Sequence, residues 1–164
     1  MKSKSTNILI SLAAMFSLLA LIVRLVVFCG PQKFFVELCG GGALTEDYSN
    51  VSDPIGITKA IIFFVFYLIV CIITVVNKRK ASGKIACFVC IVVQFISNLL
   101  SPIITATVVS IFIYNQGAKY LATYSYLSNI ASSIQSSFTS AASILLCITL
   151  GTLMGKDENE QQNY

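Results

Sequence analysis

Four long apolar segments, separated by short polar stretches, dominate the hydrophobic pattern of this chain. They cover residues 8–28, 57–76, 85–114 and 121–154. A bilayer core is about 30 Å thick and is crossed by about 20 helical residues, so each segment is long enough for one crossing. Helices are expected because a backbone in lipid must satisfy its own hydrogen bonds, and no segment alternates as barrel strands do. The pattern predicts an all-α, polytopic membrane protein, in which residues 1–155 form a single four-helix transmembrane bundle.

The composition supports a membrane location. Hydrophobic residues make up 56% of the 164 residues and charged residues only 11%. The mean hydropathy is +0.83. A soluble domain this poor in charge would expose large apolar patches, which soluble monomers avoid. We therefore expect an integral, multi-pass protein in contact with the lipid bilayer, in a plasma or cytoplasmic membrane rather than an organelle.

Basic residues predict the orientation of the spans and exclude one class of partner. Seven of the eleven lie near the two ends or in the loop after the second span: Lys2, Lys4, Lys78, Arg79, Lys80, Lys84 and Lys156. Basic residues concentrate on the cytoplasmic side, so both termini are expected there and the loop at residues 30–56 is expected outside. No basic patch suggests a nucleic acid partner. The tail at residues 156–164 has no core-forming residues and is expected to be disordered.

Polar residues follow one side of the third and fourth predicted spans. The third carries Gln94, Asn98 and Ser101 at helical spacing beside Pro102, and the fourth carries serines at four-residue steps, Ser128, Ser132, Ser136 and Ser140. Small residues at this spacing let two helix backbones approach closely, which favours a role in helix packing. The alternative is a polar path between the third and fourth spans, bent at the proline.

Arg24 is the one charged residue well inside a predicted span. An intramembrane charge suggests a functional site. An arginine four residues from the end of a span can also reach the headgroups or make a structural hydrogen bond. Cys29 and Cys39 both fall on the predicted outer side, where a disulfide between them is permitted.

The sequence lacks the residues that most enzymes use for catalysis. The chain has no histidine, and no acidic residue falls within any of the four predicted spans. The usual proton relay and paired carboxylates are therefore lacking, and no phosphate-binding glycine loop is present. We expect no enzyme, no cofactor and no metal site.

The layout of four spans with both ends on one side is similar to that of tetraspan groups such as claudins, tetraspanins and MARVEL-domain proteins. Claudins carry a tryptophan in the first outer loop, and this chain has none. Tetraspanins carry a Cys-Cys-Gly motif in a large second outer loop, which here is only residues 115–120. The chain is therefore assigned to none of these groups.

Two functions are expected from these features. The first is a small non-enzymatic membrane protein that acts through helix–helix contacts, either by forming a homo-oligomer or as an accessory subunit of a larger membrane-protein partner. The second is a small transporter or channel with a polar path between the third and fourth spans.

Overall fold

The computed structural model describes residues 2–39, 50–76 and 81–161 of the chain, all arranged around long helices. The elements in chain order are α1 (Lys2–Cys29), α2 (Gln32–Leu38), α4 (Pro54–Val76), α5 (Ala81–Val108), the π-helical turn Val109–Ile113, the 3-10 turn Tyr114–Gln116 and α6 (Ala118–Gln161). Among the described residues, α1, α4, α5 and α6 are each long and apolar enough to cross a membrane. The structure therefore agrees with an all-helical, multi-pass membrane protein.

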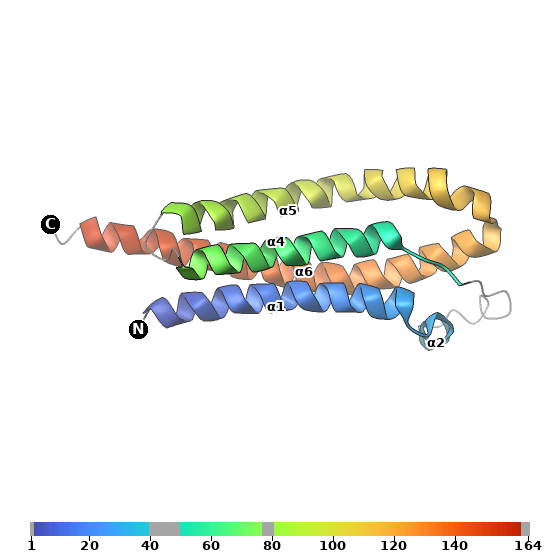
Figure 1. Cartoon of the computed structure of the whole chain (residues 1–164), viewed down its shortest axis with the longest axis horizontal. Coiled ribbons are helices and arrows are strands. Elements are labelled where there is room, and N and C mark those ends of the chain that lie inside the picture. The colour runs from blue at the N-terminus through green and yellow to red at the C-terminus, as the bar shows by residue number, and fades with distance from the viewer. Residues whose placement is uncertain (1, 40–49, 77–80, 162–164) are drawn as a thin grey trace.

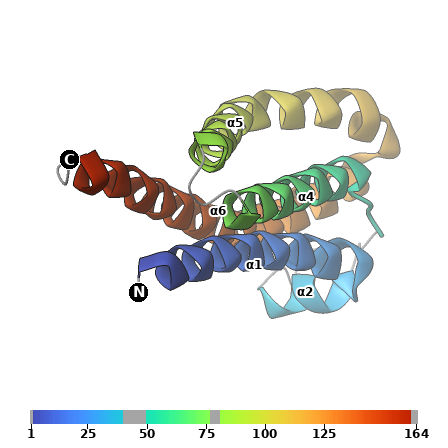
Figure 2. The same cartoon turned by 60° about the vertical axis from the view of Figure 1, so that its left-hand side comes forward.

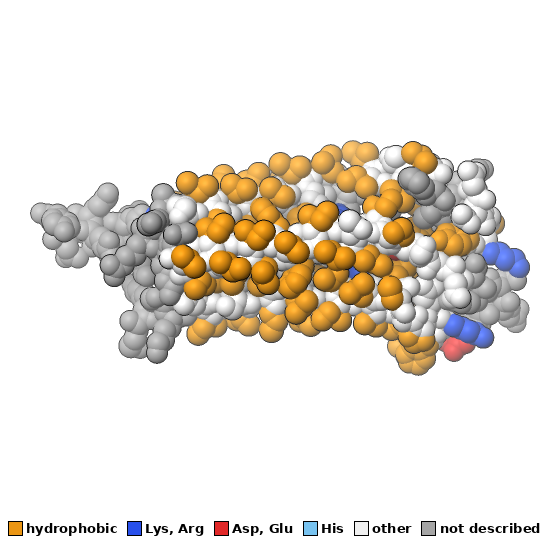
Figure 3. Space-filling model, viewed as in Figure 1, with side chains coloured by type: hydrophobic (Ala, Val, Ile, Leu, Met, Phe, Trp, Pro, Cys, Tyr) orange, Lys and Arg blue, Asp and Glu red, His pale blue; other side chains and the backbone are white. Residues whose placement is uncertain are grey.

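The long helices run side by side in an up-and-down bundle (Figure 1). Both termini lie at one end, here called the terminal end, and α2 and the turn from α5 to α6 lie at the other, here called the loop end (Figure 1). Apolar side chains cover much of the face of the bundle seen in Figure 3, whereas charged side chains are visible at the loop end. This distribution suits a helix bundle surrounded by hydrocarbon.

The helix boundaries follow from local sequence signals. Asp53 caps the start of α4, because its carboxylate accepts a hydrogen bond of 3.0 Å from the Gly56 N–H, and Pro54 occupies the first helical position, where it needs no N–H. The second span thus begins before residue 57. α5 continues through Pro102. Gly117 turns the chain into α6 with φ 99°, a conformation that glycine adopts easily.

The last helix continues beyond the fourth apolar segment. α6 ends at Gln161 and so includes residues 156–161 of the polar tail, while the expected disorder of the tail stays a prediction. Extending an existing helix needs no new nucleation, and the lysine, glutamates and glutamine of this segment are good helix formers. Residues 162–164 lie outside the described part of the chain.

The interior of the bundle contains two apolar clusters. The terminal-end core draws on all four long helices and includes Ile10, Ala13, Tyr67, Val70, Cys87, Cys90, Ala142 and Leu146. The loop-end core joins α1 and α6 to α2 and the segment before α4, and includes Val27, Phe28, Val36, Val51, Tyr124, Leu127 and Ala131. Between these two cores α6 is largely polar or small, and α1 contributes Ser17 and Arg24; the candidate site lies there.

Candidate functional site: a polar cavity between the helices

A cavity of about 170 Å³ lies between the two apolar cores, bounded by α1, α4, α5 and α6. Its polar lining consists of Ser17, Arg24, Lys59, Gln94, Asn98, Ser101, Ser132, Gln135, Ser136 and Thr139. A single water needs about 10–15 Å³, so the cavity is large enough for several waters or a small polar group. A polar space of this kind is unusual at the depth where the helices are most apolar.

The cavity continues toward the loop end into a wider space, here called the vestibule. The vestibule has a volume of about 560 Å³ and shares Arg24, Lys59, Ser101 and Ser132 with the cavity. Its further lining includes Asp53, Pro102, Thr105, Tyr124, Ser128 and Asn129. Together the two spaces form a polar path from the loop end to the middle of the bundle.

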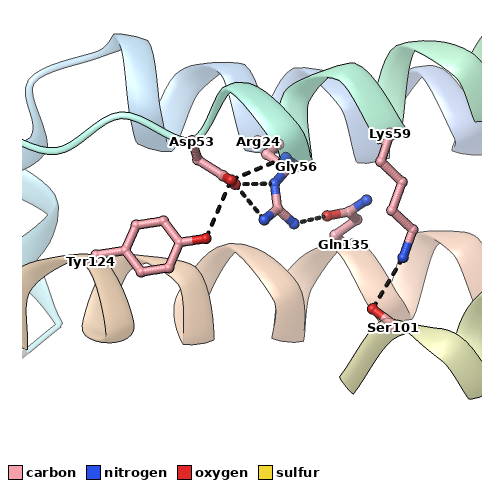
Figure 4. A network of polar contacts seen from close by, with 7 residues as sticks. All are labelled: Arg24, Asp53, Gly56, Lys59, Ser101, Tyr124 and Gln135. Atoms are coloured by element: carbon pink, nitrogen blue, oxygen red, sulfur yellow. Dashed lines mark hydrogen bonds and ion pairs between the residues drawn. The ribbon is translucent and has the colours of Figure 1, made fainter. Parts of the chain in front are cut away.

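An ion pair between Arg24 and Asp53 stands at the boundary between vestibule and cavity (Figure 4). The Arg24 Nε donates to Asp53 Oδ2 at 2.7 Å, and its Nη2 also contacts that oxygen. On the other side, Nη1 donates to Gln135 Oε1 at 2.8 Å. Arg24 thus turns into the bundle and connects α1 to α4 and α6.

The Asp53 carboxylate is buried and satisfied from several directions. Tyr124 donates its hydroxyl to Oδ1 at 3.3 Å, in addition to the N–H of Gly56 and the guanidinium. A Cβ at Gly56 would overlap both the carboxylate and the guanidinium, so the close approach requires glycine. Farther out, Gln32 fixes the segment before α4, since its amide donates to Val51 O at 2.6 Å and accepts from Val51 N at 3.1 Å.

Lys59 gives the cavity a second positive charge. Its half-buried ammonium donates to the Ser101 hydroxyl at 3.0 Å, across from α4 to α5 (Figure 4). Within the described residues, the ion pair of Arg24 and Asp53 is the only salt bridge. The cavity and vestibule are thus lined by two cations and one carboxylate, which leaves a net positive charge.

Three hydrogen-bonded residues, Tyr67, Gln94 and Thr139, close the cavity toward the terminal end. The Tyr67 hydroxyl donates to Gln94 Oε1, and Gln94 Nε2 donates to the Thr139 carbonyl at 3.2 Å. These bonds connect α4, α5 and α6 at the border between the cavity and the terminal-end core. The polar path is therefore closed toward the terminal end by these bonded side chains.

The structure brings most of the predicted polar residues together. All but one of them line the cavity or the vestibule: Gln94, Asn98, Ser101, Pro102, Ser128, Ser132 and Ser136. Ser140 is exposed and lines neither space. Cys29 and Cys39 are both exposed and carry free thiols in this structure, so a bridge between them stays a prediction. No metal-ligand group of three His, Cys, Asp or Glu residues occurs within the described ranges.

The sequence analysis did not predict four residues of the site: Asp53, Lys59, Tyr124 and Gln135. Asp53 fell in the predicted outer loop at residues 30–56, and Lys59 fell at the outer end of the predicted second span at residues 57–76. The Asp53-Pro54 pair also has the pattern of a helix N-cap, which would have moved the start of α4 and placed Lys59 in its second turn. Nothing local singles out Tyr124, whereas Gln135 is one of the polar residues inside the fourth apolar segment.

No family model, no curated protein and no solved structure matches this chain.

Proposed function

We propose that this chain is a non-enzymatic multi-pass membrane protein that binds a negatively charged group in the polar cavity, as a small transporter does. The observation that carries this proposal is the charge of the lining, where Arg24 and Lys59 are balanced only by Asp53. Charged side chains at membrane depth are costly and are typical of solute and ion pathways.

Lys59 is the residue with most to gain from an anion. The Asp53 carboxylate is already bonded to Arg24, Tyr124 and the Gly56 N–H. Lys59 instead donates to a neutral hydroxyl. A bound anion would supply the opposite charge that Lys59 lacks, in a surrounding of low dielectric where such an interaction is strong.

The access to the cavity supports a carrier more than a continuous channel. The vestibule lies on the loop-end side of the cavity, and the bonded side chains of Tyr67, Gln94 and Thr139 close the way to the terminal end. With the orientation expected from the basic residues, the vestibule would lie on the outer side. A transporter needs access from one side at a time, which this arrangement provides.

A function through helix contacts has one feature in its favour. Ser140 is an exposed member of the serine ladder that lies outside the cavity, so it is available to another helix. Ser132 and Ser136, in contrast, line the cavity, which accounts for their small size and polarity without a partner. Self-association or attachment to a larger complex is therefore our second proposal.

Chemical labelling of single cysteines tests the anion-binding proposal. Ser132→Cys would be reconstituted in vesicles and treated with two membrane-impermeant methanethiosulfonates, one bearing a sulfonate and the other a trimethylammonium group. Modification would be read by mass spectrometry of the peptide, so the native cysteines stay in place. Relative to free cysteine, we expect the anionic reagent to be preferred roughly tenfold or more, because the local field concentrates anions.

Ser140→Cys is the matched control on the same helix. It is expected to be protected from both reagents, since it lies outside the polar spaces. Protection of Ser132→Cys from both reagents, or its preference for the cationic one, would contradict the proposal. Face-specific crosslinks between copies through Ser140→Cys would support the second proposal.

A further inference from the structure

The cavity is open on one flank, between α4 and α5. α5 diverges from the other helices toward the loop end in both views (Figures 1 and 2). From Phe95 to Thr107 its residues are exposed except Ser97 and Ser101, which are half-buried. The exposed residues include the large apolar Leu99, Ile103 and Ile104. This part of α5 is therefore in contact with the surroundings on most of its circumference.

An apolar groove of about 480 Å³ follows this opening, and we call it the α4–α5 groove. It is lined mainly by Ile55, Ile62 and Phe63 of α4 and Ile104 of α5. Lys59 also lines it, and both Lys59 and Phe63 line the polar cavity as well. The groove thus begins where the cationic cavity ends, with an ammonium group at the junction.

We propose that the ligand of this site is an anionic lipid that enters sideways from the bilayer through the α4–α5 groove. This inference depends on the proposed function, because it uses the same cavity. The negatively charged headgroup occupies the cavity beside Lys59 and Arg24, and an acyl chain follows Ile55, Ile62, Phe63 and Ile104 outward. The charged headgroup of an anionic lipid matches the cationic cavity, and its acyl chain matches the apolar α4–α5 groove.

Charge complementarity and continuity favour this occupant over a water-borne anion. A free anion would need only the cavity and the vestibule and would leave the groove without a role. A zwitterionic lipid would fill the groove, but its headgroup has no net charge and would leave the net positive charge of the cavity uncompensated. An anionic lipid meets both requirements, since its headgroup pairs with the ammonium and its chain stays in apolar surroundings.

Lipid titration of the purified full-length chain in detergent tests this assignment. Phosphatidylglycerol, phosphatidylcholine with the same chains, and glycerol phosphate would be added separately, and native mass spectrometry would count the bound molecules. We expect phosphatidylglycerol to bind at least roughly tenfold more tightly than the other two, since only it combines the net charge with the chains. The Lys59→Gln variant should lose most of this preference.

Two further variants separate a specific site from general attraction. Lys33→Gln removes an exposed positive charge on α2 and should leave lipid binding unchanged. Ile104→Trp fills the groove and should weaken phosphatidylglycerol binding, while Ser132→Cys in the same background keeps its preference for the anionic reagent. Equal effects of Lys33→Gln and Lys59→Gln would overturn the lipid assignment.

The outcomes distinguish this inference from the proposed function. If glycerol phosphate binds as tightly as phosphatidylglycerol, the ligand is a free anion, and the lipid assignment fails while the anion site stands. If no lipid preference is found but Ser132→Cys keeps its anionic preference, the same conclusion follows. If copies of the chain crosslink through Ile62→Cys, the groove is occupied by another helix and the lipid assignment fails. If Ser132→Cys is protected from both reagents, both proposals fail together.

Discussion

The Arg24 guanidinium of α1 and the Asp53 carboxylate before α4 form an ion pair inside the bundle, although 29 residues separate them in the chain. The side chains of both are largely withdrawn from the surface, with exposed fractions of 12% and 3%. The pair joins the end of α1 to the start of α4 and neutralises Arg24. Lys59 is then the charge in the cavity that has no carboxylate partner among the described residues.

Removing the Asp53 carboxylate should destabilise the protein strongly. Asp53→Ala leaves the Arg24 guanidinium buried without its counter-charge and removes the cap of α4. Breaking a buried ion pair on one side costs about 3–5 kcal/mol. Thermal unfolding followed by circular dichroism in detergent should show this loss as a lower Tm.

The double variant Arg24→Met and Asp53→Leu separates the ion pair from general damage. It removes both charges at similar volume and should recover most of the stability lost in Asp53→Ala, because no unpaired charge is left. Glu37→Ala, which removes an exposed carboxylate on α2, should change the free energy of unfolding by less than about 0.5 kcal/mol. A double variant no more stable than Asp53→Ala would contradict this explanation.

Two glycine substitutions should have opposite effects on stability. In Gly56→Ala the added methyl group overlaps the Arg24 and Asp53 side chains, so the ion pair must shift. Overpacking of this kind costs about 1–3 kcal/mol. In Gly151→Ala the methyl group meets no atom within 4 Å, and alanine favours the helix by up to about 1 kcal/mol. Equal Tm values for the two variants would contradict the close packing at Gly56.

Loss of the Tyr67 hydroxyl should weaken the closure of the cavity. Tyr67→Phe leaves Gln94 Oε1 without its buried donor, and an unsatisfied buried polar group costs about 1–3 kcal/mol. Tyr126→Phe is the control, because the Tyr126 hydroxyl donates to Cys39 O at 2.5 Å in an exposed position where water can replace it. Thermal unfolding should therefore show the larger loss for Tyr67→Phe, and the reverse order would contradict the assigned role of this bond.

Neutralising Lys59 should remove the preference of the cavity for anions. In Lys59→Gln the lining keeps one cation and one carboxylate, so its net charge falls to zero. The reaction of Ser132→Cys with the sulfonate reagent should slow by roughly tenfold relative to the trimethylammonium reagent. The same measurement on Lys33→Gln should show no change. If the ratio of the rates with the two reagents is unchanged in Lys59→Gln, groups other than Lys59 produce the positive potential of the cavity.

The sequence predicted the candidate spans closely because hydropathy is a local property. A run of about twenty apolar residues identifies a helix suited to hydrocarbon, whatever it packs against. The polar stripe of α5 and the serine ladder of α6 were also visible, since residues at three- and four-residue spacing share one side of a helix. The cavity lining therefore contains most of the residues that the pattern singled out, with Ser140 as the exception.

The pairing of charges was decided only by the tertiary structure. The sequence alone could not show that Arg24 meets Asp53 and Gln135, because this contact depends on how α1, α4 and α6 pack together. Nor could it show that Lys59 lies beside a cavity, because a cavity exists only between helices. By itself the sequence determined which segments are helices suited to lipid, whereas packing determined which of their few polar groups are brought together in the interior.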